Sequence, residues 1–180
     1  TTLLTELHGC GATNAFVCIC DPESTTSAIE AGPKAELELT IGAKNDTLHG
    51  APFKAHFRVL SIHDGKFFET KARHGGFTQF DQGPTAVVET LDTEIKVMLT
   101  TRRMPPFSLA QLTSCELAPK LFSIIVAKGV IAPLAAYRPV AKSFIHVDTP
   151  GVTRADMTRL NYSHRRRPMF PFEKSNTQLL

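Results

Sequence analysis

The segment Asn14-Ala15-Phe16-Val17-Cys18-Ile19-Cys20-Asp21 limits the possible folds of this chain more than any other feature. It is apolar almost throughout and ends at an Asp-Pro step, which is typical of a strand covered on both faces. Pro22 suits the first turn of a helix, which we expect to continue to Ala31. A buried strand that leads directly into a helix predicts an α/β domain.

The two ends of the chain continue this pattern. Residues 1–7 carry apolar side chains at helical spacing and stop before Gly9, so we expect the chain to open inside a helix, with an upstream segment removed. Further predicted elements are a half-buried strand over 35–42, a buried strand over 121–127, a short helix over 132–141 and a strand over 143–147.

The middle third predicts antiparallel strands instead. Residues 53–62 and 66–70 flank Asp64-Gly65, a hairpin signal, and a glycine-rich connection leads to strands over 85–91 and 94–100. Ser108 suits the cap of a short helix that ends at Cys115. We therefore predict one compact α/β domain over residues 1–180, with a mixed parallel and antiparallel sheet and helices on its faces.

Composition excludes several classes of partner. Apolar residues make up 42% and charged residues 21% of the chain, and the net charge is only +3, so neither disorder nor nucleic-acid binding is indicated. The basic run Arg165-Arg166-Arg167 is followed by prolines and phenylalanines, which favours an extended arm over a nucleic-acid contact. No apolar stretch is long enough for a membrane helix.

The cysteines indicate a reducing compartment. Cys18 and Cys20 alternate along the predicted strand, so both thiols face the same side and are poorly aimed to bridge each other. We interpret them as buried free thiols in a cytoplasmic protein, in preference to a disulfide or a metal pair.

Lys128 is the first candidate for a binding residue. With Gly129 it follows a predicted buried strand, and ligands of open α/β sheets gather at the carboxyl ends of strands. Lys128 is therefore a candidate to hold an anionic substrate group or a carboxylate of a partner domain. The alternative is a lysine that covers the sheet edge and pairs with a nearby acid.

Two further segments have both a functional and a structural interpretation. Gly75 and Gly76 open a loop whose backbone amides could approach a ligand, although such glycines more often serve tight turns. The Arg102 guanidinium, next to Arg103, suits a carboxylate, although a solvated surface pair is the more common arrangement.

No catalytic residue and no metal site is predicted in this chain. His56 and His63 lie on one predicted strand, where their odd separation sends them to opposite faces. The other histidines are scattered, at positions 8, 49, 74, 146 and 164. Because no serine or cysteine has a nucleophile-elbow context, an independent hydrolase built on Lys128 lacks a nucleophile and an orienting base.

Several segments, in this order and spacing, together resemble the carboxy-terminal domain of the MlrC, or microcystinase C, family of metallopeptidases. The resemblance covers essentially the whole chain. Ile131 stands where many relatives have a polar residue, and the glycine-rich turn expected before Thr1 is missing. The matching segments are Val126-Ala127-Lys128-Gly129-Val130, Ala135-Ala136-Tyr137-Arg138-Pro139, His146-Val147-Asp148-Thr149-Pro150-Gly151-Val152-Thr153 and Arg166-Arg167-Pro168-Met169-Phe170-Pro171-Phe172.

The resemblance implies an amino-terminal domain, absent from this chain, that binds catalytic zinc through His and acidic ligands and cleaves small or linearised peptides. It implies that Lys128 with Gly129, and the Gly75-Gly76 loop, line the cleft between the two domains. The chain would then shape the substrate cleft and be inactive alone. A homo-oligomer is a further expectation. The alternative is a non-catalytic binding or assembly module that retains the family fold.

Overall fold

The computed structural model describes residues 1–45, 50–71, 76–151 and 156–173. They fall into two units, residues 1–146 and 147–180, which are considered separately. In chain order the elements are α1 (Thr2–Gly9), β1 (Ala15–Cys20), α2 (Pro22–Ala31), β2 (Glu36–Ile41), β3 (Phe53–His63), β4 (Lys66–Phe68), β5 (Gln79–Asp81), β6 (Thr85–Thr90), β7 (Lys96–Thr100), α3 (Ala110–Thr113), the 3-10 helix η1 (Pro119–Leu121), β8 (Ile124–Val126), α4 (Leu134–Tyr137) and the 3-10 helix η2 (Met157–Arg159).

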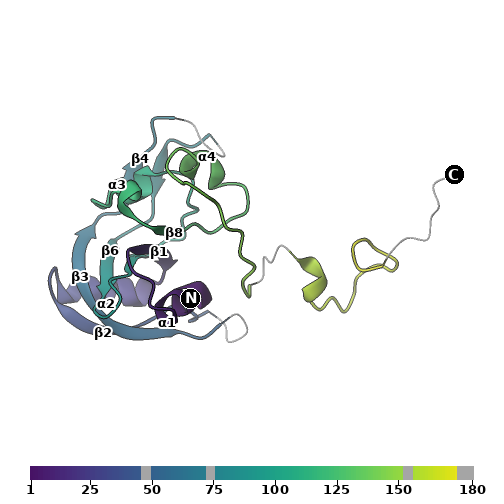
Figure 1. The fold of residues 1–180 in the computed structure, drawn as a ribbon, viewed down its shortest axis with the longest axis horizontal. Helices are drawn as coiled ribbons and strands as arrows, with labels where there is room; N and C mark the ends of the chain where they lie inside the picture. Colours follow the sequence, from purple (N-terminus) through teal and green to yellow (C-terminus); the bar gives the residue numbers. More distant parts are fainter. Residues whose placement is uncertain (46–49, 72–75, 152–155, 174–180) are drawn as a thin grey trace. The chain divides into compact units, whose positions relative to one another are not determined.

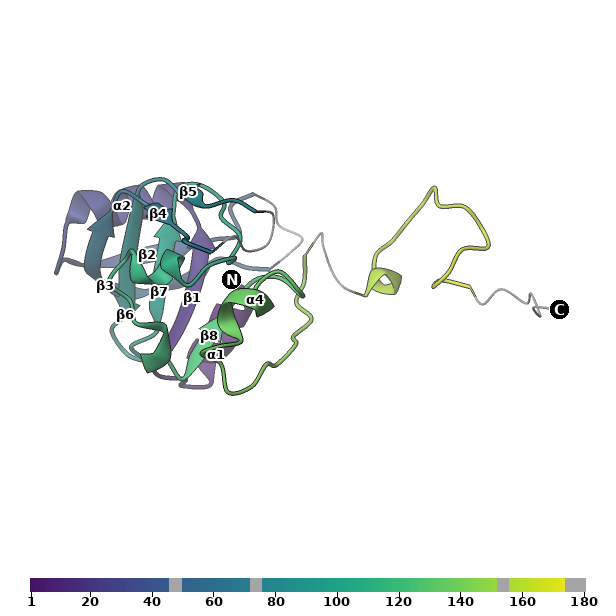
Figure 2. The same ribbon diagram turned by 90° about the horizontal axis from the view of Figure 1, so that it is seen from above.

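The first unit is built on a mixed sheet with the strand order β2-β3-β6-β7-β1-β8. Strand β1 runs parallel to both of its neighbours, β7 and β8, whereas the pairs β2–β3, β3–β6 and β6–β7 are antiparallel. Figure 2 shows these strands side by side. The predicted α/β fold with a mixed sheet is therefore confirmed.

Helices cover both faces of this sheet, and each face has its own apolar core. Figure 1 shows α1 and α2 on one side of the sheet and α3 and α4 on the other. Leu4 of α1 and Ala28 of α2 pack with Val17 of β1 in the first core. Phe16, the neighbour of Val17 along β1, packs in the second core with residues of α3 and α4. Strand β1 is thus covered on both faces, as its apolar sequence predicts.

The predicted hairpin at Asp64-Gly65 is wrong. Strand β4 pairs with β5 in a separate two-stranded sheet and does not pair with β3. Gly65 has a φ of +76° and lies directly against the backbone of Gly83, so the chain leaves the main sheet at this point. The Asp-Gly pair does form a tight turn, but the turn packs against a distant loop and does not return the chain beside β3.

A β-bulge in β3 corrects the expectation that His56 and His63 face opposite sides of the sheet. The pairing of β3 with β6 shifts by one residue at Leu60, so that Arg58 and Ser61, three positions apart, lie opposite residues two positions apart. One extra residue inverts the alternation that follows it. Both histidines therefore lie on the same face of the sheet.

The predictions for the carboxy-terminal third are partly wrong. Strand β8 is a short edge strand with Ile124 39% exposed, and α4 is a single turn because Pro139 has no N–H to continue it. The strand predicted over 143–147 does not form: within the described ranges the segment pairs with neither edge of the sheet, and Ile145 is 85% exposed. A strand-like sequence does not make a strand unless the chain brings it beside a sheet edge.

In the second unit, the segment predicted as an extended arm folds back on itself. The Arg165 guanidinium donates to the Glu173 carboxylate, with one N–O distance of 2.7 Å, and lies 4.4 Å from the centre of the Phe172 ring. The Met169 N–H donates to the same carboxylate. Arg165 therefore closes a compact loop.

Candidate functional site

The carboxyl ends of three adjacent parallel strands, β7, β1 and β8, meet at one edge of the main sheet. From the end of β1 the chain continues into α2 on one face, whereas from the end of β7 it continues to α3 on the other face. Strand ends whose connections leave to opposite faces leave a crevice between them, and this is where ligands of open α/β sheets bind.

A cleft of about 420 Å³ lies at this position. Its walls are residues 20–23, at the end of β1 and directly after it, residues 42–45, which follow β2, and Thr101 and Arg103, which follow β7. Strand β2 is at the far edge of the sheet, but the sheet curls beneath α1 and α2 (Figure 1), and this brings the end of β2 back to the turn after β1.

Asp21 connects the segments that form these walls. It is 2% exposed, and its N–H donates to the Thr100 carbonyl at 3.0 Å, which ties the ends of β1 and β7 together. Its carboxylate accepts hydrogen bonds from the Gly42 N–H at 2.7 Å and from the Ser24 N–H and hydroxyl at 3.1 and 3.0 Å. Asp21 thus caps α2 and also anchors the end of β2.

Lys44 completes the partners of Asp21, with a 3.0 Å contact between its Nζ and Oδ1 of Asp21. Burial by itself raises the pKa of Asp21, but the hydrogen bonds from Gly42, Ser24 and Lys44 outweigh it, so the pKa lies below the ordinary value. Lys44 also lies 3.4 Å from the carboxylate of Glu23. Asp21 and Lys44 therefore neutralise each other and are occupied by structural contacts.

Arg103 is the other cation of the cleft, and its surroundings differ from those of Lys44. It is exposed, and within the described residues its guanidinium has neither an ion-pair nor a hydrogen-bond partner. Sequence analysis noted Arg103 only as the neighbour of Arg102. The position of Arg103 three residues after a buried strand was the available signal.

Lys128 and Gly129 lie at the same edge of the sheet, after β8. Gly129 has a φ of +136°, and a Cβ there would lie 3.1 Å from the Pro133 side chain. The predicted position of Lys128 at a strand end is confirmed, whereas its role in binding stays a prediction.

The other predicted site residues lie elsewhere. The Arg102 guanidinium donates to the carboxylate of Asp81, which connects the end of β7 to β5 of the small sheet. Gly76 lies in the exposed loop between β4 and β5, and a Cβ there would meet no atom within 4 Å. Gly75 is outside the described residues. The structure therefore brings Lys128 to the strand-end edge but does not bring Arg102 or Gly76 into the cleft.

No metal site forms among the described residues, in which no three His, Cys, Asp or Glu side chains converge. His8 pairs with Asp92 at 2.8 Å and His56 with Glu38 at 3.8 Å, but neither pair gains a third ligand among the described residues. The zinc implied by the resemblance thus has no fitting set of ligands in this part of the chain.

The comparison with protein families decides the relationship. A sequence model described as the MlrC C-terminus matches residues 1–164. The chain belongs to the MlrC carboxy-terminal family. The resemblance inferred from the sequence is confirmed.

The MlrC carboxy-terminal fold is also found in a solved structure. With a TM-score of 0.77 and 24% sequence identity, the chain matches the crystal structure of a candidate metallopeptidase from Mesorhizobium sp. BNC1. The match covers 90% of this chain but 32% of that chain, so the MlrC carboxy-terminal chain spans about one third of the length of that protein. Among curated proteins, none matches this chain.

The helices of this MlrC carboxy-terminal chain are short. Within the ranges that the structure describes, none combines the length and the apolar character needed to cross a bilayer.

Proposed function

We propose that this chain is the carboxy-terminal part of a zinc-dependent peptidase of the MlrC type and lines the substrate cleft for small or linearised peptides. The zinc ligands belong to an amino-terminal domain, as the family resemblance implies. This chain contributes binding and positioning, because the described residues offer neither a metal site nor an activated nucleophile. The observation that carries the proposal is the family match over residues 1–164.

An exposed apolar surface supports an amino-terminal domain as the partner. Four apolar side chains on and around the edge strand β8 have exposed fractions from 39% to 73%, namely Leu121, Ile124, Val130 and Ile131. Exposed apolar side chains near an open sheet edge suit a contact with another domain. Because the solved relative is about three times as long as this chain, the rest of such a polypeptide is available to cover this surface.

The cysteines support a cytoplasmic location. All four are free, and Cys115 is buried while Cys10 is exposed. An exposed free thiol is typical of proteins kept in a reducing compartment.

The test compares the chain alone with the chain combined with an MlrC-family amino-terminal domain. We expect zinc, measured by inductively coupled plasma mass spectrometry, and hydrolysis of a linear peptide only in the combined preparation. About one zinc per chain in the chain alone would overturn the assignment of the metal to the other domain.

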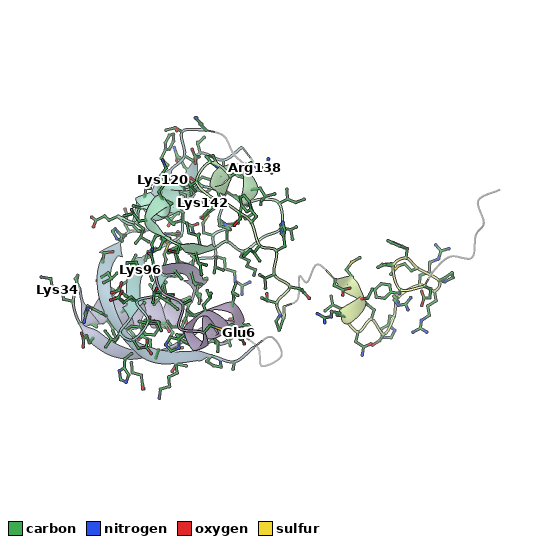
Figure 3. The ribbon with its side chains drawn as sticks, in the orientation of Figure 1. Glu6, Lys34, Lys96, Lys120, Arg138 and Lys142 are labelled. Atoms are coloured by element: carbon green, nitrogen blue, oxygen red, sulfur yellow. The ribbon has the colours of Figure 1, made fainter. Side chains whose placement is uncertain are left out.

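A matched pair of variants tests the role of Lys128 in the combined protein. Lys128→Met is expected to raise KM for an anionic linear peptide by roughly tenfold, because it removes a charge at the strand-end edge. Lys142→Met is the control, since Lys142 is exposed in the segment that follows α4 (Figure 3). Equal KM values for the two variants would remove Lys128 from the substrate cleft.

A further inference from the structure

We infer that the cleft between the carboxyl ends of β1 and β7 is a binding site for a carboxylate group, with Arg103 as the residue that recognises it. The inference depends on the proposed function only in naming the end of a peptide as the source of that carboxylate.

The position of the cleft is the first support. Strands β1 and β7 are parallel neighbours, paired from Phe16 opposite Lys96 to Cys20 opposite Thr100, and their connections leave to opposite faces of the sheet. The cleft opens where these two strands end. Its volume of about 420 Å³ is within the range of sites that accept small molecules or the end of a peptide.

The charges around the cleft select the group that binds. The cleft carries the acids Asp21 and Glu23 and the cations Lys44 and Arg103. Asp21 is saturated by four donors, and Lys44 is held between the two acids. Arg103 is the cation of the cleft that has no partner within the described residues, so an incoming anion meets its guanidinium.

The chemistry of Arg103 favours a carboxylate. A guanidinium presents parallel N–H donors whose spacing matches the two oxygens of a carboxylate. A phosphate would bring a second negative charge close to Glu23, which is 79% exposed and only partly offset by Lys44 at 3.4 Å. A singly charged anion therefore suits the site better than a dianion.

Arg102 and Arg103 are neighbours with different functions. The guanidinium of Arg102 is bound to Asp81 of the chain itself. Since that ion pair fixes the loop after β7 to the small sheet, Arg103 is presented from an anchored backbone. A pre-positioned cation loses less entropy on binding than one on a free loop.

The first experiment is calorimetric titration of the chain alone, without metal, with N-acetyl-trialanine as the free acid, the same peptide as the amide, and inorganic phosphate. We expect the acid to bind, and Arg103→Gln to weaken it at least about tenfold. The amide and phosphate should bind more weakly than the acid. The control Arg138→Gln removes an exposed arginine at the end of α4 (Figure 3) that does not line this cleft, and it should leave binding unchanged.

Several results would overturn the inference. They are no binding of the acid, equal binding of acid and amide, tighter binding of phosphate, or equal losses in the two arginine variants. Because the titration needs no metal and no second domain, failure of the proposed peptidase function leaves its outcome unaffected.

A second experiment uses Cys20, which lines the same cleft. Its thiolate displaces iodide from both iodoacetate and iodoacetamide, and only iodoacetate carries a carboxylate. We expect the ratio of the iodoacetate rate to the iodoacetamide rate to be higher at Cys20 than at the exposed Cys10, and Arg103→Gln to abolish this difference. Equal ratios at the two cysteines in the unaltered chain would contradict the inference, whatever the variant does.

Discussion

Gly65 and Gly83 are in backbone contact, and a Cβ built on Gly65 would lie 1.8 Å from the Gly83 carbonyl oxygen. Both glycines are buried and have positive φ angles, of +76° and +69°. The turn after β3 can pack against the backbone of the turn after β5 only because Gly65 has no side chain, whereas a Cβ on Gly83 would instead meet the side chain of Thr101. This contact fixes where the small sheet begins and ends.

Replacing Gly65 by Ala should therefore be severely destabilising. The atom that a Cβ meets is backbone and cannot rotate away, so we expect the free energy of unfolding to fall by about 3 kcal/mol or more. Gly76→Ala is the matched control, since Gly76 has a similar φ of +73° but open space around its Cβ position. It should cost about 1–2 kcal/mol from backbone strain alone. Urea denaturation measures both, and similar losses would disprove the close contact.

The buried carboxylate of Asp21 should make a large contribution to stability. Asp21→Asn keeps the shape of the side chain but removes the nearer of the two carboxylates beside Lys44 and the acceptor charge for three further hydrogen bonds, and we expect a loss of about 2–4 kcal/mol at pH 7. Chemical denaturation of the two proteins would measure this difference in the free energy of unfolding. Glu94→Gln, at an exposed position in the turn before β7, is the control and should change stability little.

The same substitution should alter the dependence of stability on pH. Because the pKa of Asp21 is lower in the folded state, its stabilisation is complete above the unfolded value, about 3.9, and is lost as pH falls through the lower folded value. The unaltered chain should thus lose more free energy of unfolding than Asp21→Asn on acidification from pH 5 toward that lower folded value. Parallel pH profiles for the two proteins would contradict this.

The thiols should differ in reactivity in the folded chain. Burial raises the pKa of Cys18 to about 12 and that of Cys115 to about 11, and the thiolate is the reactive form. Cys10 is exposed and should react first with a disulfide reagent, whereas Cys18 and Cys115 should react only after unfolding. Peptide mapping by mass spectrometry after timed labelling would identify each site. Early labelling of Cys115 would show that α3 does not cover it stably.

In the second unit, Glu173 should titrate at unusually low pH. Hydrogen bonds from Arg165 and then from the Met169 N–H lower the pKa of Glu173 to about 2. Carbon-detected NMR titration should show this value, and Arg165→Gln should move it toward the ordinary glutamate value of about 4.3. Arg166→Gln is the control, and an equal shift in that variant would show that overall charge, not the specific pair, sets the pKa.

The sequence was sufficient to predict the amino-terminal half of the fold because its patterns are local. The apolar run of β1, the Asp-Pro start of α2 and the alternation in β2 each depend on neighbouring residues. The predictions of a strand over 143–147 and of a hairpin at Asp64-Gly65 failed because both depend on distant partners, namely a sheet edge that the first segment does not reach and Gly83 for the second.

The candidate site was predicted only in part, for the same reason. Lys128 was identified because a strand end is visible in the sequence. Lys44 was not, because it reaches Asp21 only through the curl of the sheet. Arg102 and Arg103 are chemically alike, and the place of Asp81 in the fold distinguishes the paired guanidinium of Arg102 from that of Arg103, which has no partner among the described residues.

The bulge at Leu60 makes one residue of β3 dispensable to the pairing that follows it. Leu60 packs in the second core and Ile62 against the first, so removing Leu60 would leave Ser61, Ile62 and His63 on their present faces and opposite the same residues of β6. A homologous chain that is one residue shorter at this point can therefore keep the same order of polar and apolar residues in the second half of the strand. Sequence alignments of the family should tolerate a one-residue gap at this position without a compensating insertion.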